Sequence, residues 1–212
     1  MGIPVDAVDF FAELEVNNER GWWIANQDRW RRVVRDPMQK LCDDLADEFG
    51  DAKLFRPHRD VRFSADKSPY KIHQGAVVLT STGVGYYVQI SSQGLLTGGG
   101  WYQPAPEQIT AYREAVLDDD AGAELAGIAA QLERDEVELV GERLKTAPRG
   151  VDPRHPRIAL LRHKTLLASV EHAIPDWLES EELPEHVAQE WRTYRPLLEW
   201  LGSHLVLAEA GR

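Results

Sequence analysis

Apolar side chains recur at helical spacing through the first fifty residues, which predicts three helices there. The three stripes are Ala7, Phe10, Phe11 and Leu14, then Trp22, Trp23, Trp30 and Val33, then Met38, Leu41, Cys42, Leu45 and Phe49. Asp36 and Pro37 mark the expected start of the third helix, because Asp caps a helix and proline suits its first turn. Cys42 lies in the third stripe, so we expect a buried structural cysteine.

The middle of the chain has the pattern of β-strands. Residues 75–80 form an apolar run, and residues 86–91 and 95–102 are separated by a short segment containing Gly94, which is typical of an antiparallel hairpin. Gly98, Gly99 and Gly100 lack the spacing of a phosphate loop, and we interpret them as positions of close backbone approach.

Helical spacing returns after Pro104, and it continues with Leu125, Ile128 and Leu132. Residues 136–140 and 165–172 are predicted strands. A last helix is expected up to Leu205, with a break or kink at Pro196. Helices, then antiparallel strands, then helices predict an α+β fold, with a central antiparallel sheet packed by N-terminal and C-terminal helices in a single compact domain over residues 1–212.

The net charge of −11 hides two basic segments. Residues 53–73 carry six Lys or Arg against two acidic residues, and residues 143–164 carry seven against one. Pro57 disfavours helix at Arg56, and the alternation over residues 60–64 predicts a short strand with Asp60 and Arg62 on one face. If the strands next to the two segments adjoin in one sheet, their basic side chains converge on one face.

Several stretches resemble the domain of unknown function 2461 family of bacterial and fungal proteins. The longest is RPHRDVRFSADKSPYKIHQGA, residues 56–76, and it is joined by NNERGWW, GYYVQIS, GGGWYQP, LKTAPRG, HPRIALLRHK and WRTYRPLLEWL. The resemblance covers essentially the whole chain and implies a single α+β domain. It implies no substrate, cofactor or catalytic residue. Trp23 departs from the phenylalanine expected there, and Val16 from the alanine.

The basic segments predict a site for a small anionic, phosphate-containing ligand, because Arg forks and Lys ammonium groups bind phosphate and carboxylate. Nearby Trp22, Trp23, Tyr70 and Trp101 are candidates to stack on a base or sugar. If the protein is an enzyme, Asp60 or His73 is the candidate general base, and the basic groups stabilise negative charge. The candidate ligand-binding residues are Arg56, Arg59, Arg62, Lys67, Lys71, Arg149, Arg162 and Lys164.

Two alternatives stay open on the sequence alone. The basic face is an interaction surface for protein or nucleic acid, or its charges belong to structural ion pairs with Asp60, Asp66 and the acidic helices. The histidines form no metal-binding motif, so no metal site is assigned, and no cofactor is indicated. The chain shows no signal peptide and no apolar run long enough for a membrane span, and its single cysteine fits a reducing compartment, so we expect a cytoplasmic protein.

Overall fold

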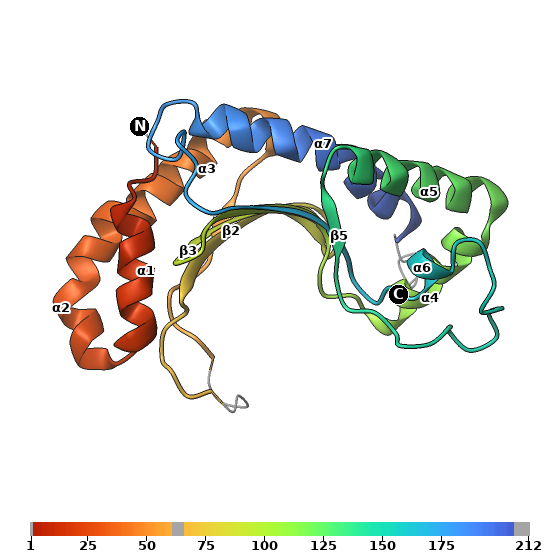
Figure 1. Ribbon diagram of the computed structural model, residues 1–212, viewed down its shortest axis with the longest axis horizontal. Coiled ribbons are helices and arrows are strands. Elements are labelled where there is room, and N and C mark those ends of the chain that lie inside the picture. The colour runs from red at the N-terminus through yellow and green to blue at the C-terminus, as the bar shows by residue number, and fades with distance from the viewer. Residues whose placement is uncertain (1, 61–65, 206–212) are drawn as a thin grey trace, which may run out of the picture. The chain divides into compact units, whose positions relative to one another are not determined.

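The computed structural model describes residues 2–60 and 66–205 and confirms the predicted α+β fold. A six-stranded antiparallel sheet has the strand order β1-β2-β3-β4-β6-β5, with helices at both ends of the chain (Figure 1). The helices are α1 (Asp6–Val16), α2 (Arg20–Trp30), the π-helix η1 (Arg31–Arg35), α3 (Asp36–Phe49), α4 (Pro106–Leu117), α5 (Asp119–Arg134), α6 (Ile158–Leu161) and α7 (Leu183–His204). The strands are β1 (Lys53–Leu54), β2 (His73–Ser81), β3 (Val84–Ser91), β4 (Gly94–Trp101), β5 (Glu138–Val140) and β6 (Leu166–His172).

Contacts divide the chain into two compact units. Unit 1 contains residues 1–78, 87–97 and 171–190, and unit 2 contains residues 79–86, 98–170 and 191–212. The basic segment 53–73 therefore belongs to unit 1 and the basic segment 143–164 to unit 2. Among the described residues, no helix has both the length and the apolar character needed to cross a bilayer.

The predicted start of the third helix is confirmed, because α3 begins at Asp36 with Pro37 in its first turn, although no break separates it from α2. The chain stays helical there, and the π-helix η1 joins α2 to α3, with the Asp36 amide donating to the Arg31 carbonyl five residues back. Pro37 has no N–H to donate and its ring crowds the preceding turn, so a widened turn accommodates it without a break. Cys42 is buried as predicted, and burial raises the pKa of its thiol to about 11.

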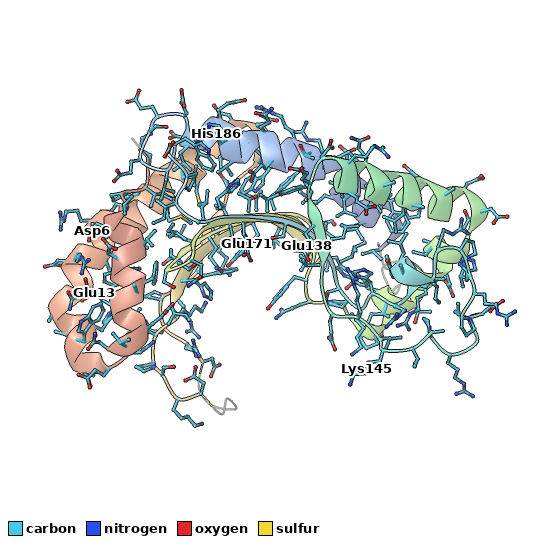
Figure 2. All side chains as sticks on the ribbon, in the orientation of Figure 1. Asp6, Glu13, Glu138, Lys145, Glu171 and His186 are labelled. Carbon is cyan, nitrogen blue, oxygen red and sulfur yellow. The ribbon has the colours of Figure 1, made fainter. Side chains whose placement is uncertain are left out.

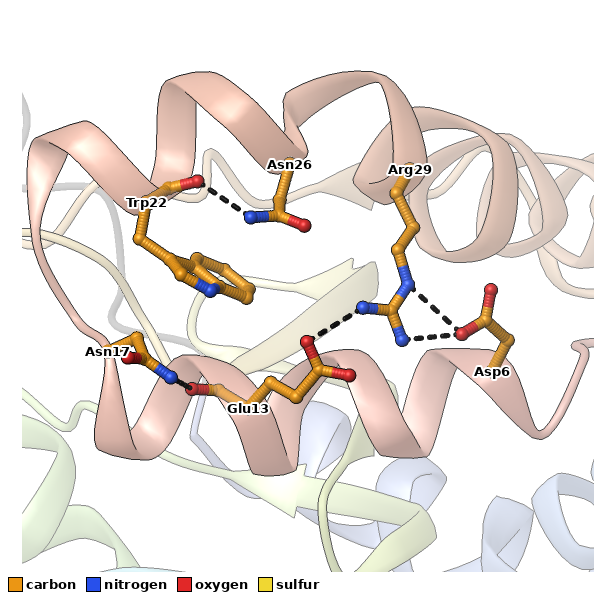
Figure 3. A network of polar contacts seen from close by, with 6 residues as sticks. All are labelled: Asp6, Glu13, Asn17, Trp22, Asn26 and Arg29. Carbon is orange, nitrogen blue, oxygen red and sulfur yellow. Dashed lines mark hydrogen bonds and ion pairs between the residues drawn. The ribbon is translucent and has the colours of Figure 1, made fainter.

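Helix α1 is joined to α2 by the Arg29 guanidinium (Figure 3). Its Nε and Nη2 atoms donate to Asp6 Oδ1 at 3.0 and 2.6 Å, and Nη1 donates to Glu13 at 2.9 Å. The same group lies 5.7 Å from the ring centre of Phe10. The hydrogen bonds to Asp6 and Glu13 raise the pKa of Arg29, so this cation is balanced on both sides by carboxylates of α1.

The central strands confirm the antiparallel arrangement predicted for residues 75–102. Side chains alternate along β3, with Val84, Tyr86, Val88 and Ile90 buried and the intervening residues half-buried. Tyr86 stacks on Trp191 of α7 at 5.1 Å, so the buried face of β3 is the one that α7 covers. The half-buried face, which carries Tyr87 and Gln89, is the opposite one.

The glycines of β4 confirm the prediction of close backbone approach. A Cβ atom at Gly99 would lie 2.9 Å from Leu198 Cδ1 and 3.2 Å from Tyr194 Cβ, both on α7. Gly100 has a φ of +145°, and a Cβ there would lie 2.3 Å from the Leu166 carbonyl. Helix α7 runs through Pro196 from Leu183 to His204, so the predicted break at this proline is wrong. Contacts of buried Trp191, Leu197 and Leu201 on both sides of Pro196 hold the helix in place.

Candidate functional site

The basic segment of unit 1 forms an antiparallel extension of β1 and β2, which we call the basic arm (residues 53–60 and 66–73). The Phe55 amide donates to the Gly75 carbonyl at 2.9 Å, the Lys71 amide to the Pro57 carbonyl at 2.8 Å, and the Arg59 amide to the Pro69 carbonyl at 2.9 Å. Figure 1 shows the arm extending away from the strands. The strand predicted over residues 60–64, including Arg62, lies outside the described residues except for Asp60.

The arm is attached to the N-terminal helices through Asn18. The Asn18 carboxamide donates to the Tyr70 carbonyl at 2.9 Å and accepts from the Tyr70 amide at 3.1 Å, as a neighbouring strand would. The Tyr70 ring stacks on Trp23 at 4.2 Å, and His58 lies 5.2 Å from Tyr70. Two of the stretches that carry the family resemblance, residues 17–23 and 56–76, therefore meet here and fix the direction of the arm.

Burial corrects the expectation that Trp23, Tyr70 and Trp101 bind a base or sugar. Trp23 and Tyr70 are buried against each other. Trp22 lies 5.3 Å from Phe10, and Trp101 is buried and lies 5.5 Å from Tyr112 in unit 2. The rings of Trp23, Tyr70 and Trp101 thus belong to the hydrophobic cores of the two units, which is the commoner use of large aromatic side chains, whereas Trp22 is half-buried.

Two side chains of the arm, Lys71 and His73, lie close enough to neighbouring cations for their pKa values to be lowered. Burial lowers the pKa of Lys71, and the positive charges of Arg56 and Arg59 lower it further. Burial also lowers the pKa of His73, followed by the charges of Lys71 and Arg59. We call Arg56, Arg59, Lys71 and His73 the basic cluster. Its positive potential disfavours further positive charge and favours an anion.

The basic cluster has few carboxylate partners within the described part of the chain. Arg59 pairs with Asp66, whose pKa is lowered by hydrogen bonds from Ser68 and then by the charge of Arg59. Lys71 Nζ lies 5.0 Å from the ring centre of Phe55, a cation–π contact. Arg56, Lys71 and His73 form no ion pair with a described Asp or Glu.

The other residues predicted for the arm are less informative. Asp60 and Lys67 are exposed and have further interactions in the folded chain. His73 begins β2 and is half-buried, and the direction of its pKa shift favours the neutral imidazole, the form that accepts a proton. Of the two candidate bases, His73 is thus the one that lies within the basic cluster.

The basic residues of unit 2 have different surroundings. Arg162 Nε donates to the Leu144 carbonyl at 2.7 Å, and its Nη2 donates to the Lys145 carbonyl at 2.8 Å. Lys164 forms an ion pair with Glu142. Arg149 is exposed and has no side-chain partner among the described residues, and Lys145 lies in the same loop (Figure 2). Convergence of these residues with the basic arm remains a prediction.

Three residues near the basic cluster were missed by the sequence analysis. Tyr87 and Gln89 project from the half-buried face of β3, where the Tyr87 hydroxyl lies 2.7 Å from Gln89 Oε1. The ring of Phe55 lies 6.2 Å from the ring of Tyr87, at an angle of 34°. The alternation in GYYVQIS already places Tyr87 and Gln89 together, but it does not say which face the helices cover.

A second polar cluster of unit 1 joins β4, β6 and α7. His172 Nε2 lies 2.6 Å from Glu190 Oε1, and the fully buried Thr97 hydroxyl donates to the other carboxylate oxygen. The ring of Trp177 lies 5.0 Å from His172 and stacks on His186 at 4.4 Å. Glu190 thus accepts from two strands and holds α7 against them. Within residues 2–60 and 66–205, no group of three His, Cys, Asp or Glu side chains is arranged to hold a metal ion.

The chain matches the family described as "Conserved hypothetical protein (DUF2461)" over residues 6–200, and it belongs to that family. No curated protein and no solved structure matches the chain.

Proposed function

We propose that the basic cluster of unit 1 binds a compact anionic ligand through a phosphate group. The observation that supports this proposal is the crowding of cations on the arm: besides burial, the charges of Arg56 and Arg59 lower the pKa of Lys71, and those of Lys71 and Arg59 lower the pKa of His73. Arg56, Lys71 and His73 have no ion pair with a described carboxylate. Crowded like charges destabilise a folded chain unless an anion balances them. A bound phosphate supplies that balance.

The chemistry of the side chains suits a phosphate. The exposed guanidinium of Arg56 presents donors in a planar fork, and the ammonium group of Lys71 adds a point charge. His73 stands beside them in its neutral form, so it is the candidate proton acceptor if the bound ligand reacts. The free, buried thiol of Cys42 is consistent with a cytoplasmic protein, which is the location we propose.

The proposal is tested by isothermal titration calorimetry with inorganic phosphate and pyrophosphate. Replacing Arg56 by alanine is expected to weaken binding by about 1.5–3 kcal/mol, the scale of charge-assisted hydrogen bonds. The matched control is Arg154→Ala, because Arg154 is exposed, lies in unit 2 and has no side-chain partner among the described residues. The control removes the same charge and is expected to leave the affinity unchanged.

Three results would contradict the proposal. Equal losses of affinity in the two variants would show that only net charge matters. No phosphate binding by the wild-type protein, together with a loss of stability in Arg56→Ala, would support the structural ion-pair alternative. Binding of long nucleic acid or protein in place of phosphate would support an interaction surface.

A further inference from the structure

The half-buried faces of Phe55 and Tyr87 lie directly beside the basic cluster. Phe55 is on the arm next to Arg56, and its ring receives the Lys71 ammonium group at 5.0 Å. The Tyr87 ring lies 6.2 Å from the Phe55 ring. The other aromatic rings near the arm, Trp23 and Tyr70, are buried in the core. The rings of Phe55 and Tyr87 therefore form an aromatic surface of unit 1 that adjoins the proposed phosphate site.

The position of Tyr87 is set by a glycine on the neighbouring strand. A Cβ atom at Gly75 would lie 2.3 Å from the Tyr87 hydroxyl oxygen and 2.8 Å from its Cε2 atom. The Tyr87 ring thus lies across the bare backbone of β2, and the Phe55 amide bonds to the carbonyl of the same Gly75. Close approach of a side chain to a strand glycine orients the ring before any ligand binds.

Gln89 adds hydrogen-bonding capacity to this surface. Its side-chain oxygen is held by the Tyr87 hydroxyl at 2.7 Å, and its amide nitrogen donates to no described residue. A carboxamide presents a donor and an acceptor side by side, which matches the polar edge of a nucleobase. A phosphate site, two aromatic rings and an oriented carboxamide thus lie together on one side of unit 1.

We propose that the phosphate-bearing ligand is a free nucleoside phosphate, whose base contacts Phe55 and Tyr87 and whose base edge faces Gln89. This inference rests on the proposed function, because it places the phosphate on the basic cluster. The overall charge of −11 favours a small nucleotide over a long nucleic acid strand, whose many phosphates require an extended basic surface.

The experiment compares three probes by calorimetry: inorganic phosphate, ribose 5-phosphate and a set of nucleoside monophosphates. At least one nucleoside monophosphate is expected to bind about tenfold more tightly than ribose 5-phosphate, the increment typical of one base on an aromatic ring. Phe55→Leu and Tyr87→Leu are each expected to reduce that increment. Tyr87→Leu keeps the Phe55 ring beneath the Lys71 ammonium group and is expected to leave the affinity for inorganic phosphate unchanged. Arg56→Ala is expected to weaken the binding of all three probes.

Tyr87→Phe keeps the ring and removes only the hydroxyl that holds Gln89, so it is expected to retain most of the increment in affinity. This variant keeps the inference testable if Tyr87→Leu folds poorly. Proton NMR provides an independent readout, because base protons shift upfield when they lie over an aromatic ring. Equal binding of ribose 5-phosphate and every nucleotide would overturn this inference and leave the proposed function intact. Binding of no phosphate probe would overturn both, and affinity that rises with oligonucleotide length would overturn the free nucleotide as the ligand.

Discussion

Two segments of this chain are similarly rich in Lys and Arg, but the folded protein surrounds their charges differently. In unit 2, Arg162 donates to two backbone carbonyls and Lys164 pairs with Glu142. In unit 1, Arg56 and Lys71 have no ion pair with a described carboxylate and lie close to each other. A high density of basic residues in a sequence therefore does not by itself indicate a binding site. The partners of each charge distinguish a structural group from one available to a ligand.

The largest expected effect is the loss of stability on removing Arg162. Arg162→Ala leaves the carbonyls of Leu144 and Lys145 without their charged donor, which is expected to cost about 1–3 kcal/mol in urea-induced unfolding. Phosphate affinity is expected to stay the same. A loss of phosphate affinity with unchanged stability would instead show that the two basic segments form one site.

Arg29 provides a paired cation within unit 1 itself. Arg29→Ala breaks the hydrogen bonds to Asp6 and Glu13, and a loss of about 1–2 kcal/mol is expected from the unfolding free energy, since all three side chains are partly exposed. The matched variant is Arg31→Ala, whose partner Asp28 is almost fully exposed, and it is expected to change stability by less than about 0.5 kcal/mol. Equal losses of stability in Arg29→Ala and Arg31→Ala would mean that the more buried ion pairs of Arg29 contribute no more than the exposed pair of Arg31.

Removing the charge of Lys71 is expected to change stability in the opposite direction. Lys71→Met keeps an apolar stem over Phe55 and removes a half-buried charge next to Arg56 and Arg59. Without ligand, thermal unfolding is expected to show unchanged or slightly higher stability, by up to about 0.5 kcal/mol. A clear loss of stability in this variant would show that the Lys71 charge stabilises the fold, as the charges of Arg162 and Lys164 are expected to do.

The smallest expected effect is a pH dependence that arises from His73. The folded state lowers the pKa of His73 below its ordinary value of 6.5, so the unfolded chain binds the proton more readily. The free energy of unfolding is therefore expected to fall as the pH drops through 6.5, and His73→Gln should flatten the profile. The lowered pKa of buried His163 acts in the same direction and remains in the variant. Added phosphate should reduce the His73 contribution, because an anion favours the protonated ring, and a profile unchanged by His73→Gln would exclude His73 as its source.

Much of the architecture was predictable because local patterns determine it. Apolar runs separated by a glycine turn placed β2, β3 and β4, and the stripe through Cys42 placed a buried helix face. The break predicted at Pro196 was wrong, because a proline ends a helix only where the packing of the surrounding turns does not keep the chain helical. The outcome there depends on contacts that are distant in the sequence.

The candidate site was predictable in part. Its charged members lie in one dense segment, so Arg56, Arg59, Lys71 and His73 were found from composition and spacing. Phe55, Tyr87 and Gln89 were not, because Tyr86 and Tyr87 are equivalent in the sequence until α7 covers one face of β3. Gly75 has a role only once its neighbouring strand is known.

The absence of a side chain at Gly99 limits which residues can occupy this position and the positions of α7 that face it. Because Leu198 and Tyr194 of α7 lie where a side chain at position 99 would be, the space there is shared between helix and strand. A larger residue at position 99 is tolerable only with a smaller one at position 198, and the free-energy cost of the two changes together is less than their sum. Positions 99 and 198 are therefore expected to vary together among members of the family, because their combined size limits how closely helix and sheet approach.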